Sequence, residues 1–160
     1  MSLPGKVTWK LSAFGTLTVD ALYALLQLRG EVFVLEQACA FQDLDGADAQ
    51  AMHLQGHVDG ALKAYARCFG PGVKFTEASI GRIVTRRDAR RTGLGHQLVQ
   101  RAIATVHEVW GVQAIRIGAQ ARLKDFYQSH GFVDAGVPYI EDEIDHLEML
   151  WLAQGDRDDC

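Results

Sequence analysis

Apolar positions recur at two spacings along this chain, every second residue in some stretches and every third or fourth in others. Alternation predicts a first strand over residues 7–14. Helical spacing begins after Thr18, whose hydroxyl is a suitable N-terminal cap, and Gly30 should kink or divide that helix. Two further helices are predicted over 93–109 and 121–129. The chain therefore mixes both kinds of element.

A hairpin is predicted where two strands, 52–58 and 61–69, flank Asp59-Gly60, a dipeptide suited to a type I′ turn. Four more strands are predicted over 79–85, 114–119, 132–137 and 145–152. The order β-α-α-β-β-β-α-β-α-β-β indicates an α/β (α+β) fold, a mixed sheet of about six to seven strands with helices on both faces. One domain should span 1–152, followed by a disordered tail over 153–160.

Composition narrows the class of protein without identifying it. The 160 residues suit one soluble domain, and the net charge of −4 argues against nucleic acid as a partner. No apolar run is long enough for a membrane-spanning helix, and the first residues lack the apolar core of a signal peptide. Three cysteines, Cys39, Cys68 and Cys160, form no Cys-x-x-Cys pair. These features predict a cytoplasmic protein without disulfides.

The segment from Ile80 to Gly95 carries the most specific chemistry, since an apolar strand leads through a basic turn into a helix. A helix N-terminus offers unpaired N–H groups to an anion. Gly93 and Gly95 have no side chain, so a phosphate group can approach the backbone closely. The turn also carries four cations, Arg86, Arg87, Arg90 and Arg91. Together these residues predict a cofactor that contains phosphate.

Two familiar phosphate-binding motifs do not fit this turn. A P-loop requires Gly-Lys-Ser/Thr, whereas His96-Gln97 follow Gly95. A dinucleotide fingerprint requires a third glycine where Leu98 stands, and an acidic residue after the next strand, 114–119, which has none. Nucleoside triphosphates and dinucleotides are therefore disfavoured as cofactors.

A third motif fits. Arg90-x-x-Gly93-x-Gly95, between a strand and a helix, resembles the acyl-CoA pyrophosphate motif of the GNAT N-acetyltransferase superfamily. The segment 126–132, Phe-Tyr-Gln-Ser-His-Gly-Phe, is similar to the second signature of that superfamily. Both motifs stand in the expected order among the predicted strands, so coincidence is a poor explanation.

The resemblance extends to the ElaA-type subgroup and covers roughly residues 9–152. Stretches similar to that subgroup are 29–37, 41–48 with His53, 64–67 and 118–121. The sequence departs from the superfamily at Arg91, where glycine is frequent, and at Gln120, where asparagine is common. The change at Arg91 costs little if that residue keeps a negative φ.

The resemblance implies direct transfer of an acetyl group from acetyl-CoA to a primary amine, with no covalent enzyme intermediate and no metal. The acceptor would be a small-molecule or peptide amine, with neither nucleic acid nor membrane as partner, and a homodimer is compatible with the fold. A non-catalytic acyl-CoA-binding or sensing module is the alternative. Contacts to coenzyme A are expected from Ile83, Val84, Thr85, Arg90, Arg91, Thr92, Gly93, Leu94, Gly95, Gln120 and Tyr127.

Three residues receive roles in the reaction. Tyr127, placed by the second motif, would protonate the departing thiolate, because an unperturbed tyrosine has a pKa of about 10. The Val84 N–H would stabilise the oxyanion. A carboxylate such as Glu141, in a loop before the last strand, or a water chain there would deprotonate the amine. The candidates for this base are Glu36, Glu77, Glu141, Asp142, His53 and His146.

Two polar groups have simpler explanations than a metal site. Asp43, Asp45 and Asp48 resemble a calcium loop, but the twelfth position is Leu54 rather than glutamate. These aspartates are expected to cap turns or to shape a cationic acceptor site. His53 and His57 are expected to be hydrogen-bonded structural residues, because no third metal ligand is in view.

Overall fold

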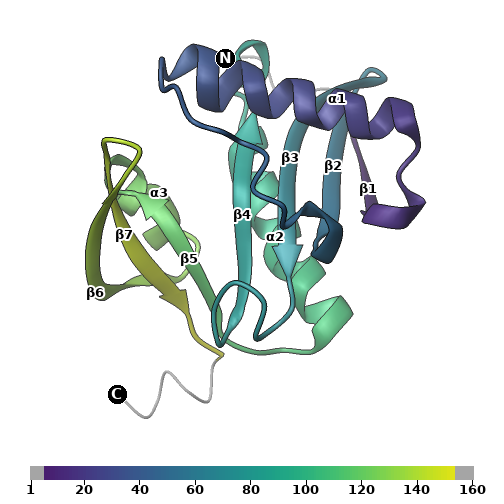
Figure 1. The fold of residues 1–160 in the computed structure, drawn as a ribbon. Helices are drawn as coiled ribbons and strands as arrows, with labels where there is room; N and C mark the ends of the chain where they lie inside the picture. The colour runs from purple at the N-terminus through teal and green to yellow at the C-terminus, as the bar shows by residue number, and fades with distance from the viewer. Residues whose placement is uncertain (1–5, 154–160) are drawn as a thin grey trace.

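The computed structural model describes residues 6–153, which form one mixed sheet with helices on both of its faces (Figure 1). The expected tail lies outside the described residues except for its first position. The strands are β1 (Val7–Ala13), β2 (Met52–Val58), β3 (Ala61–Phe69), β4 (Ala78–Thr85), β5 (Ile115–Gln120), β6 (Phe132–Glu141) and β7 (Ile144–Trp151). The helices are α1 (Val19–Arg29), the π-helix η2 (Gly30–Glu36), α2 (Leu94–Trp110) and α3 (Lys124–Gln128). Short 3₁₀ turns are η1 (Phe14–Thr16), η3 (Asp48–Gln50), η4 (Arg87–Ala89) and η5 (Ala121–Leu123).

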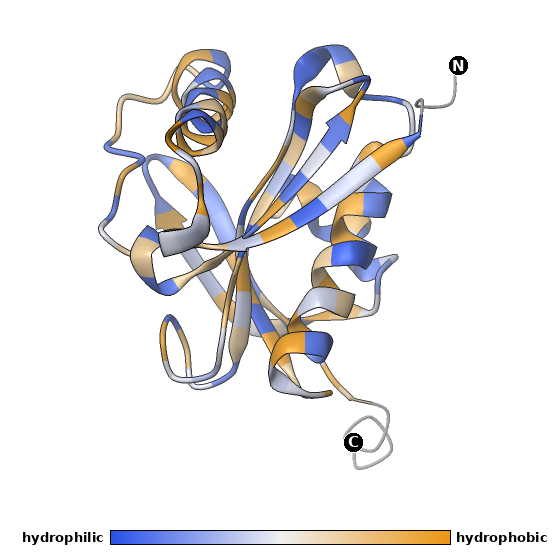
Figure 2. Cartoon of the chain, turned by 90° about the vertical axis from the view of Figure 1, so that its right-hand side faces the viewer, coloured by the Kyte–Doolittle hydropathy of each residue, from blue (hydrophilic) through white to orange (hydrophobic). Residues whose placement is uncertain are grey.

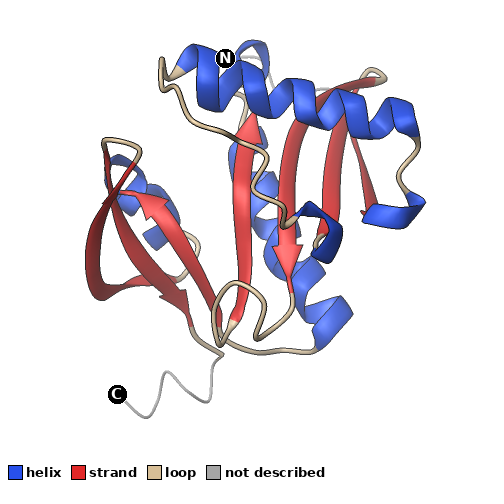
Figure 3. Cartoon of the chain, in the orientation of Figure 1, coloured by secondary structure: helices blue, strands red, loops and turns tan. Residues whose placement is uncertain are grey.

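The seven strands run in the order β1-β2-β3-β4-β5-β7-β6, and only β4 and β5 are parallel neighbours. These two strands pair at just two positions, Ala78 with Ile115 and Ser79 with Arg116. Beyond them the strands diverge, which Figure 3 shows as a separation between β4 and β5. The carboxyl halves of β4 and β5 therefore have no strand partner on the sides that face each other.

Helices cover the two faces of the sheet with different parts of the core. Leu25 and Leu28 of α1 pack with Tyr65 and Val84 on one face. On the other face, α2 contributes a buried stripe that packs with β3, β4 and β5, and its members are Leu94, Leu98, Val99, Ala102 and Val106. Figure 2 views this arrangement with the sheet between α1 and α2. Each fully buried leucine contributes about 1.5–3 kcal/mol, so the stripe anchors α2 firmly.

Most of the predicted elements are confirmed, and two differ in an informative way. The hairpin has the predicted strand bounds, with Asp59 and Gly60 at φ +52° and +80°. Thr18 caps α1, accepting a hydrogen bond from Ala21 N at 3.0 Å. Gly30 does not divide the helix: its φ and ψ of −63° and −42° are helical, and the chain continues as a π-helix. Such wide turns are frequent at functional sites.

The second difference concerns the end of the sheet. The strand predicted to end at residue 137 continues as β6 to Glu141. The turn to β7 then needs only Asp142 and Glu143, which have φ of +50° and +66°. Glu141 is therefore the last residue of a strand and not part of a loop, as the sequence had suggested. No helix of the described residues is long and apolar enough to cross a membrane.

Candidate functional site

A cavity of about 940 Å³ opens where β4 and β5 diverge. On one side it is lined by Phe33 of η2, which packs against the α1 cluster. On the other side it is lined by Leu98 of α2 and Tyr127 of α3, which belong to the opposite cluster. The cavity therefore reaches both faces of the sheet, and two molecules could enter it from opposite sides.

The start of α2 lies at the border of this cavity and has no side-chain cap. Gly93 precedes the helix with φ +84°, a left-handed conformation that glycine adopts without strain. At Gly95 a Cβ would meet nothing closer than Phe126 at 3.7 Å, so the first turn is open. The first N–H groups of a helix have no partner within the helix, so the sequence prediction of an anion site at this turn stays a prediction that this open geometry permits.

Arg91 departs from its expected conformation. Its φ is +64°, so the condition under which arginine would replace glycine cheaply is not met. A non-glycine residue in the left-handed region costs about 1–2 kcal/mol. The turn therefore retains the backbone shape that favours glycine, while an exposed cation occupies the position.

The Arg90 guanidinium is already engaged within the protein. It donates to both carboxylate oxygens of Glu36 at 2.6 Å and to the Thr85 carbonyl oxygen at 3.0 and 3.3 Å. The same pairing lowers the pKa of the Glu36 carboxyl, which makes Glu36 a poor general base. Arg90 thus ties the turn to the end of η2, whereas Arg87 and Arg91 are exposed and form no ion pair within residues 6–153.

The direction of the β4 backbone follows from one hydrogen bond. Arg86 N donates to Lys63 O of β3 at 2.8 Å. In an antiparallel ladder, alternate residues direct their N–H groups to the same neighbour, so the Val84 N–H also faces β3. The N–H groups of Ile83 and Thr85 then face the cavity that both residues line. The Val84 N–H, predicted to stabilise the oxyanion, is therefore directed away from the cavity, whereas the Ile83 N–H is directed toward it.

Tyr127 lies in α3 with only 6% of its surface exposed, yet it lines the cavity. Its ring packs edge-on against Phe126 and Phe132, with centroids 5.2 and 5.9 Å apart. Burial raises the pKa of the Tyr127 hydroxyl to about 12, so the group keeps its proton at neutral pH. A fixed, protonated hydroxyl beside a cavity is a suitable proton donor.

A possible base lies on the opposite wall, where His146 of β7 lines the cavity. Its Nδ1 lies 2.7 Å from the Ile144 carbonyl oxygen, which can only accept, so Nδ1 carries the proton of the neutral ring. The Nε2 lone pair is then free to accept, and it lies 3.9 Å from Glu141 Oε2. His146 and Glu141 were separate candidates in the sequence, and the structure brings them together.

Two other predicted bases, His53 and Glu77, are committed elsewhere. His53 is fully buried, with Nδ1 2.6 Å from the Tyr65 hydroxyl and Nε2 2.8 Å from Asp48 O, and burial lowers its pKa. Glu77 accepts two hydrogen bonds from Arg116 at 3.0 and 3.1 Å, at the paired end of β4. No three metal-ligating side chains cluster within the described residues.

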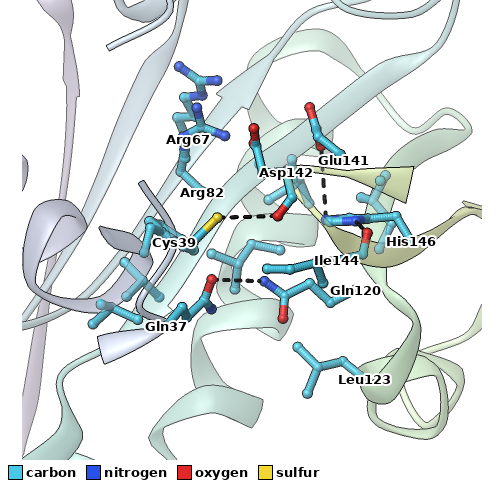
Figure 4. A pocket seen from close by; sticks show the side chains of 18 of the residues that line it. Gln37, Cys39, Arg67, Arg82, Gln120, Leu123, Glu141, Asp142, Ile144 and His146 are labelled. Atoms are coloured by element: carbon cyan, nitrogen blue, oxygen red, sulfur yellow. Dashed lines mark hydrogen bonds and ion pairs between the residues drawn. The ribbon is translucent and has the colours of Figure 1, made fainter. Parts of the chain in front are cut away.

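Two contacts cross the cavity between its walls (Figure 4). Gln120 Nε2, at the end of β5, donates to Gln37 Oε1 at 3.3 Å. The Cys39 thiol donates to the Asp142 carbonyl oxygen at 3.2 Å. Both contacts join the segment after η2 to the β5–β7 half of the sheet, so the polar groups of the two walls are held near each other.

Sequence reasoning missed a cluster of buried charges above β3 and β4. Arg29 is fully buried, with Nη1 2.6 Å from Asp48 and Nε 2.9 Å from Asp43. Arg67, 3% exposed, pairs with Asp45 and Asp48. The three aspartates therefore neutralise arginines and hold the segment 41–48 against the sheet. The only available signal was the nearness in sequence of three aspartates to an arginine at the end of a largely apolar helix.

Comparisons with known proteins agree with this geometry. The sequence model of the family described as "Acetyltransferase (GNAT) domain" matches residues 36–153. Protein ElaA of Escherichia coli is 38% identical over 145 residues, covering 89% of this chain and 95% of that protein. Its crystal structure matches with a TM-score of 0.84 at 36% identity, covering 91% of this chain and 99% of that one. The crystal structure of an acyl-CoA N-acyltransferase from Pseudomonas aeruginosa matches with a TM-score of 0.86 at 40% identity, with the same coverage of 91% and 99%.

Proposed function

We propose, from the premise that this chain belongs to the GNAT acetyltransferase family and is of its ElaA type, that it transfers an acetyl group from acetyl-CoA to a primary amine. The amine would attack directly within a ternary complex. The observation that carries this proposal is the cavity that reaches both faces of the sheet, with an uncapped helix start beside it. That shape lets acyl donor and acceptor approach the same point from opposite sides.

The residues that are present fit coenzyme A. The N–H groups at the start of α2 would bind the pyrophosphate, with Arg87 and Arg91 adding charge. The N–H and C=O groups of Ile83 and Thr85 would pair with the peptide-like pantetheine arm, as an added strand does. The Thr85 carbonyl oxygen is shared with Arg90, which fixes the end of β4 in position.

Three groups of this chain would act on the reacting atoms. The amine nitrogen forms a bond to the acyl carbon, and the carbon–sulfur bond breaks. The Ile83 N–H would stabilise the developing oxyanion, a contribution of about 3 kcal/mol. Tyr127 would supply the proton that the departing thiolate takes up.

The acceptor must lose a proton before it attacks, since a lysine-like amine has a pKa of about 10.4. His146 Nε2 would accept that proton, and Glu141 would stabilise the resulting imidazolium. This pairing replaces the lone carboxylate that the sequence favoured. It also assigns the acid to α3 and the base to β7, both of which line the cavity.

Thermal unfolding with acetyl-CoA and with free CoA tests the donor site. Ligand at 100 times its Kd should add about 2.7 kcal/mol, a shift of several degrees for a domain of this size. Release of the CoA thiol with a panel of amines then tests transfer. Absence of a shift at millimolar ligand would overturn the proposal. A shift without consumption by any amine would favour a non-catalytic acyl-CoA-binding module.

A further inference from the structure

The two walls at the acceptor end of the cavity carry opposite charge. Arg82 of β4 and Lys74, in the loop before β4, line one wall. Glu141 and Asp142, where β6 turns into β7, line the other. Figure 4 shows Arg82 facing the two acidic side chains across the cavity. A molecule that spans this gap meets a cation at one end and carboxylates at the other.

Arg82 is held rigidly with one edge unused. Its Nη2 donates to the Asp43 carbonyl oxygen at 3.0 Å, and its Nε lies 2.8 Å from Asp43 Oδ1 without the alignment of a hydrogen bond. Its guanidinium carbon lies 5.9 and 5.7 Å from the ring centroids of Phe33 and Phe41. Within residues 6–153, Nη1 forms no hydrogen bond, and the side chain is 23% exposed. Its two N–H donors therefore remain available to a ligand.

The backbone at Arg82 supports a functional role. β4 bulges here, because the pairing with β3 shifts register between Tyr65 and Arg67. Arg82 itself has φ +47°, a strained conformation for a residue with a side chain. Bulges and strain of this kind often re-aim a side chain beside an active site. Arg82 lies at this bulge and immediately precedes Ile83, the proposed contact of the acyl oxygen.

The cationic wall keeps a positive charge after its internal pairing. Four cationic side chains share three carboxylates in this cluster, namely Arg29, Arg67, Lys74 and Arg82 with Asp43, Asp45 and Asp48. The terminal nitrogens of Arg67 donate hydrogen bonds to Asp45 and Asp48. The excess charge is therefore carried toward the cavity by Arg82 and Lys74, which are partly exposed.

The acidic wall differs from the cationic wall, because its carboxylates have no lysine or arginine partner among the described residues. Glu141, Asp142 and Glu143 are exposed, and no lysine or arginine of the described residues forms an ion pair with them. The nearest group that can become cationic is His146, at 3.9 Å from Glu141. This wall therefore attracts a protonated amine to the group that would deprotonate it.

We propose that the acceptor is a zwitterionic amine, an amino acid or short peptide whose carboxylate binds Arg82 Nη1 and whose amine faces Glu141 and His146. This inference rests on the proposed acetyl transfer. A charge-assisted hydrogen bond from a fixed guanidinium recognises a carboxylate well. Because Arg82 immediately precedes Ile83 and both line the cavity with Glu141 and His146, an acceptor with its carboxylate near its amine fits, as in amino acids and dipeptides.

The test compares acceptors that differ only in charge. Thiol release from acetyl-CoA is measured with a panel of amino acids and dipeptides, with the C-terminal amides of the same dipeptides, and with the diamine cadaverine. Each is repeated with Arg82→Gln, with the charge-retaining Arg82→Lys, and with Arg101→Gln as a control on the exposed surface of α2. Dipeptides and their amides have nearly equal amine basicity, so any preference reports on the carboxylate.

We expect free dipeptides to exceed their amides in kcat/KM by at least about 10-fold, from the strength of a hydrogen bond to a charged group. Arg82→Gln should remove this preference by raising the KM of free dipeptides far more than that of their amides, and Arg82→Lys should keep part of the preference. A merely structural Arg82 would affect acids and amides alike, which would overturn the inference. Equal or better use of amides or cadaverine would refute the zwitterionic acceptor alone. Failure of every amine, despite acetyl-CoA binding, would refute the transferase as well.

Discussion

The two ends of the cavity are built in opposite ways. At the proposed donor end, backbone N–H groups of α2 and of the β4 edge would bind the cofactor, and few side chains would be needed. At the acceptor end, side chains that are distant in sequence converge, such as Arg82, Glu141 and His146. A backbone site serves a donor that is the same throughout a family. A side-chain site can be altered by single substitutions, so the acceptor end is where specificity would differ among relatives.

The donor end should be sensitive to replacement of a glycine whose backbone conformation disfavours any side chain. Gly93→Asp places a non-glycine residue at φ +84° and a negative charge where the pyrophosphate would lie. We expect CoA affinity to fall by more than about 1000-fold, from strain and repulsion together. Calorimetric titration measures the loss, and Gly15→Ala, with nothing within 4 Å of the added carbon, is the control. Retained affinity would mean that the pyrophosphate binds elsewhere.

The acceptor end should be sensitive to loss of its buried charges. Arg29→Met removes a fully buried cation and leaves Asp43 and Asp48 with one fewer partner each. Breaking a buried pair by removing one partner costs about 3–5 kcal/mol. We expect Tm to fall by about 6–20 °C, at about 2–4 °C for each kcal/mol.

The same variant separates the two ends of the cavity. CoA affinity should change little in Arg29→Met, because α2 is anchored by the part of the core on the opposite face of the sheet. The KM for the acceptor should rise, since the segment 41–48 loses its attachment. If CoA affinity fell as much as acceptor affinity, the two ends would not be independent, and the contrast between them would fail.

A third substitution addresses the point where the two ends meet. Tyr127→Phe removes the proton donor and keeps the ring that packs on Phe126 and Phe132. Loss of a general acid should lower kcat by about 10- to 1000-fold with CoA affinity nearly unchanged. Because burial raises the Tyr127 pKa to about 12, the wild-type rate should show no loss from its ionisation below about pH 10. Unchanged turnover would remove Tyr127 from the reaction.

The same contrast, between an end built from local backbone and an end built from distant side chains, explains which features could be predicted from the sequence. The turn before α2 and the hairpin at Asp59 are local, so spacing and residue type were sufficient to predict them. The direction of the Val84 N–H could not be predicted, because it depends on the pairing of β4 with β3, which no local pattern records. The pairing of Arg90 with Glu36 could not be predicted either, because Glu36 lies 54 residues away in the sequence.

The buried cluster escaped prediction for a related reason. Arg29 occupies a helix position that reads as polar, and only the folded chain brings Asp43 and Asp48 onto it. The pairing of His146 with Glu141 likewise depends on β6 continuing to its turn. Contacts between side chains from separate elements are therefore the part of this site that could not be predicted from the sequence.

The smallest effect we expect tests whether the turn acts through its backbone or its charges. Arg91→Gly relieves a left-handed strain of about 1–2 kcal/mol but adds about 0.5–1 kcal/mol of unfolded-state entropy. The net gain of about 0.5–1 kcal/mol should raise Tm by about 1–4 °C. Arg87→Gly is the matched control, since Arg87 is an exposed cation in the helical turn η4, where glycine should lower Tm. If Arg91→Gly gains stability and keeps CoA affinity, the donor end binds through its backbone. If affinity instead falls about 10-fold, as loss of a charge-assisted hydrogen bond predicts, the donor end also binds through side-chain charge, as the acceptor end does.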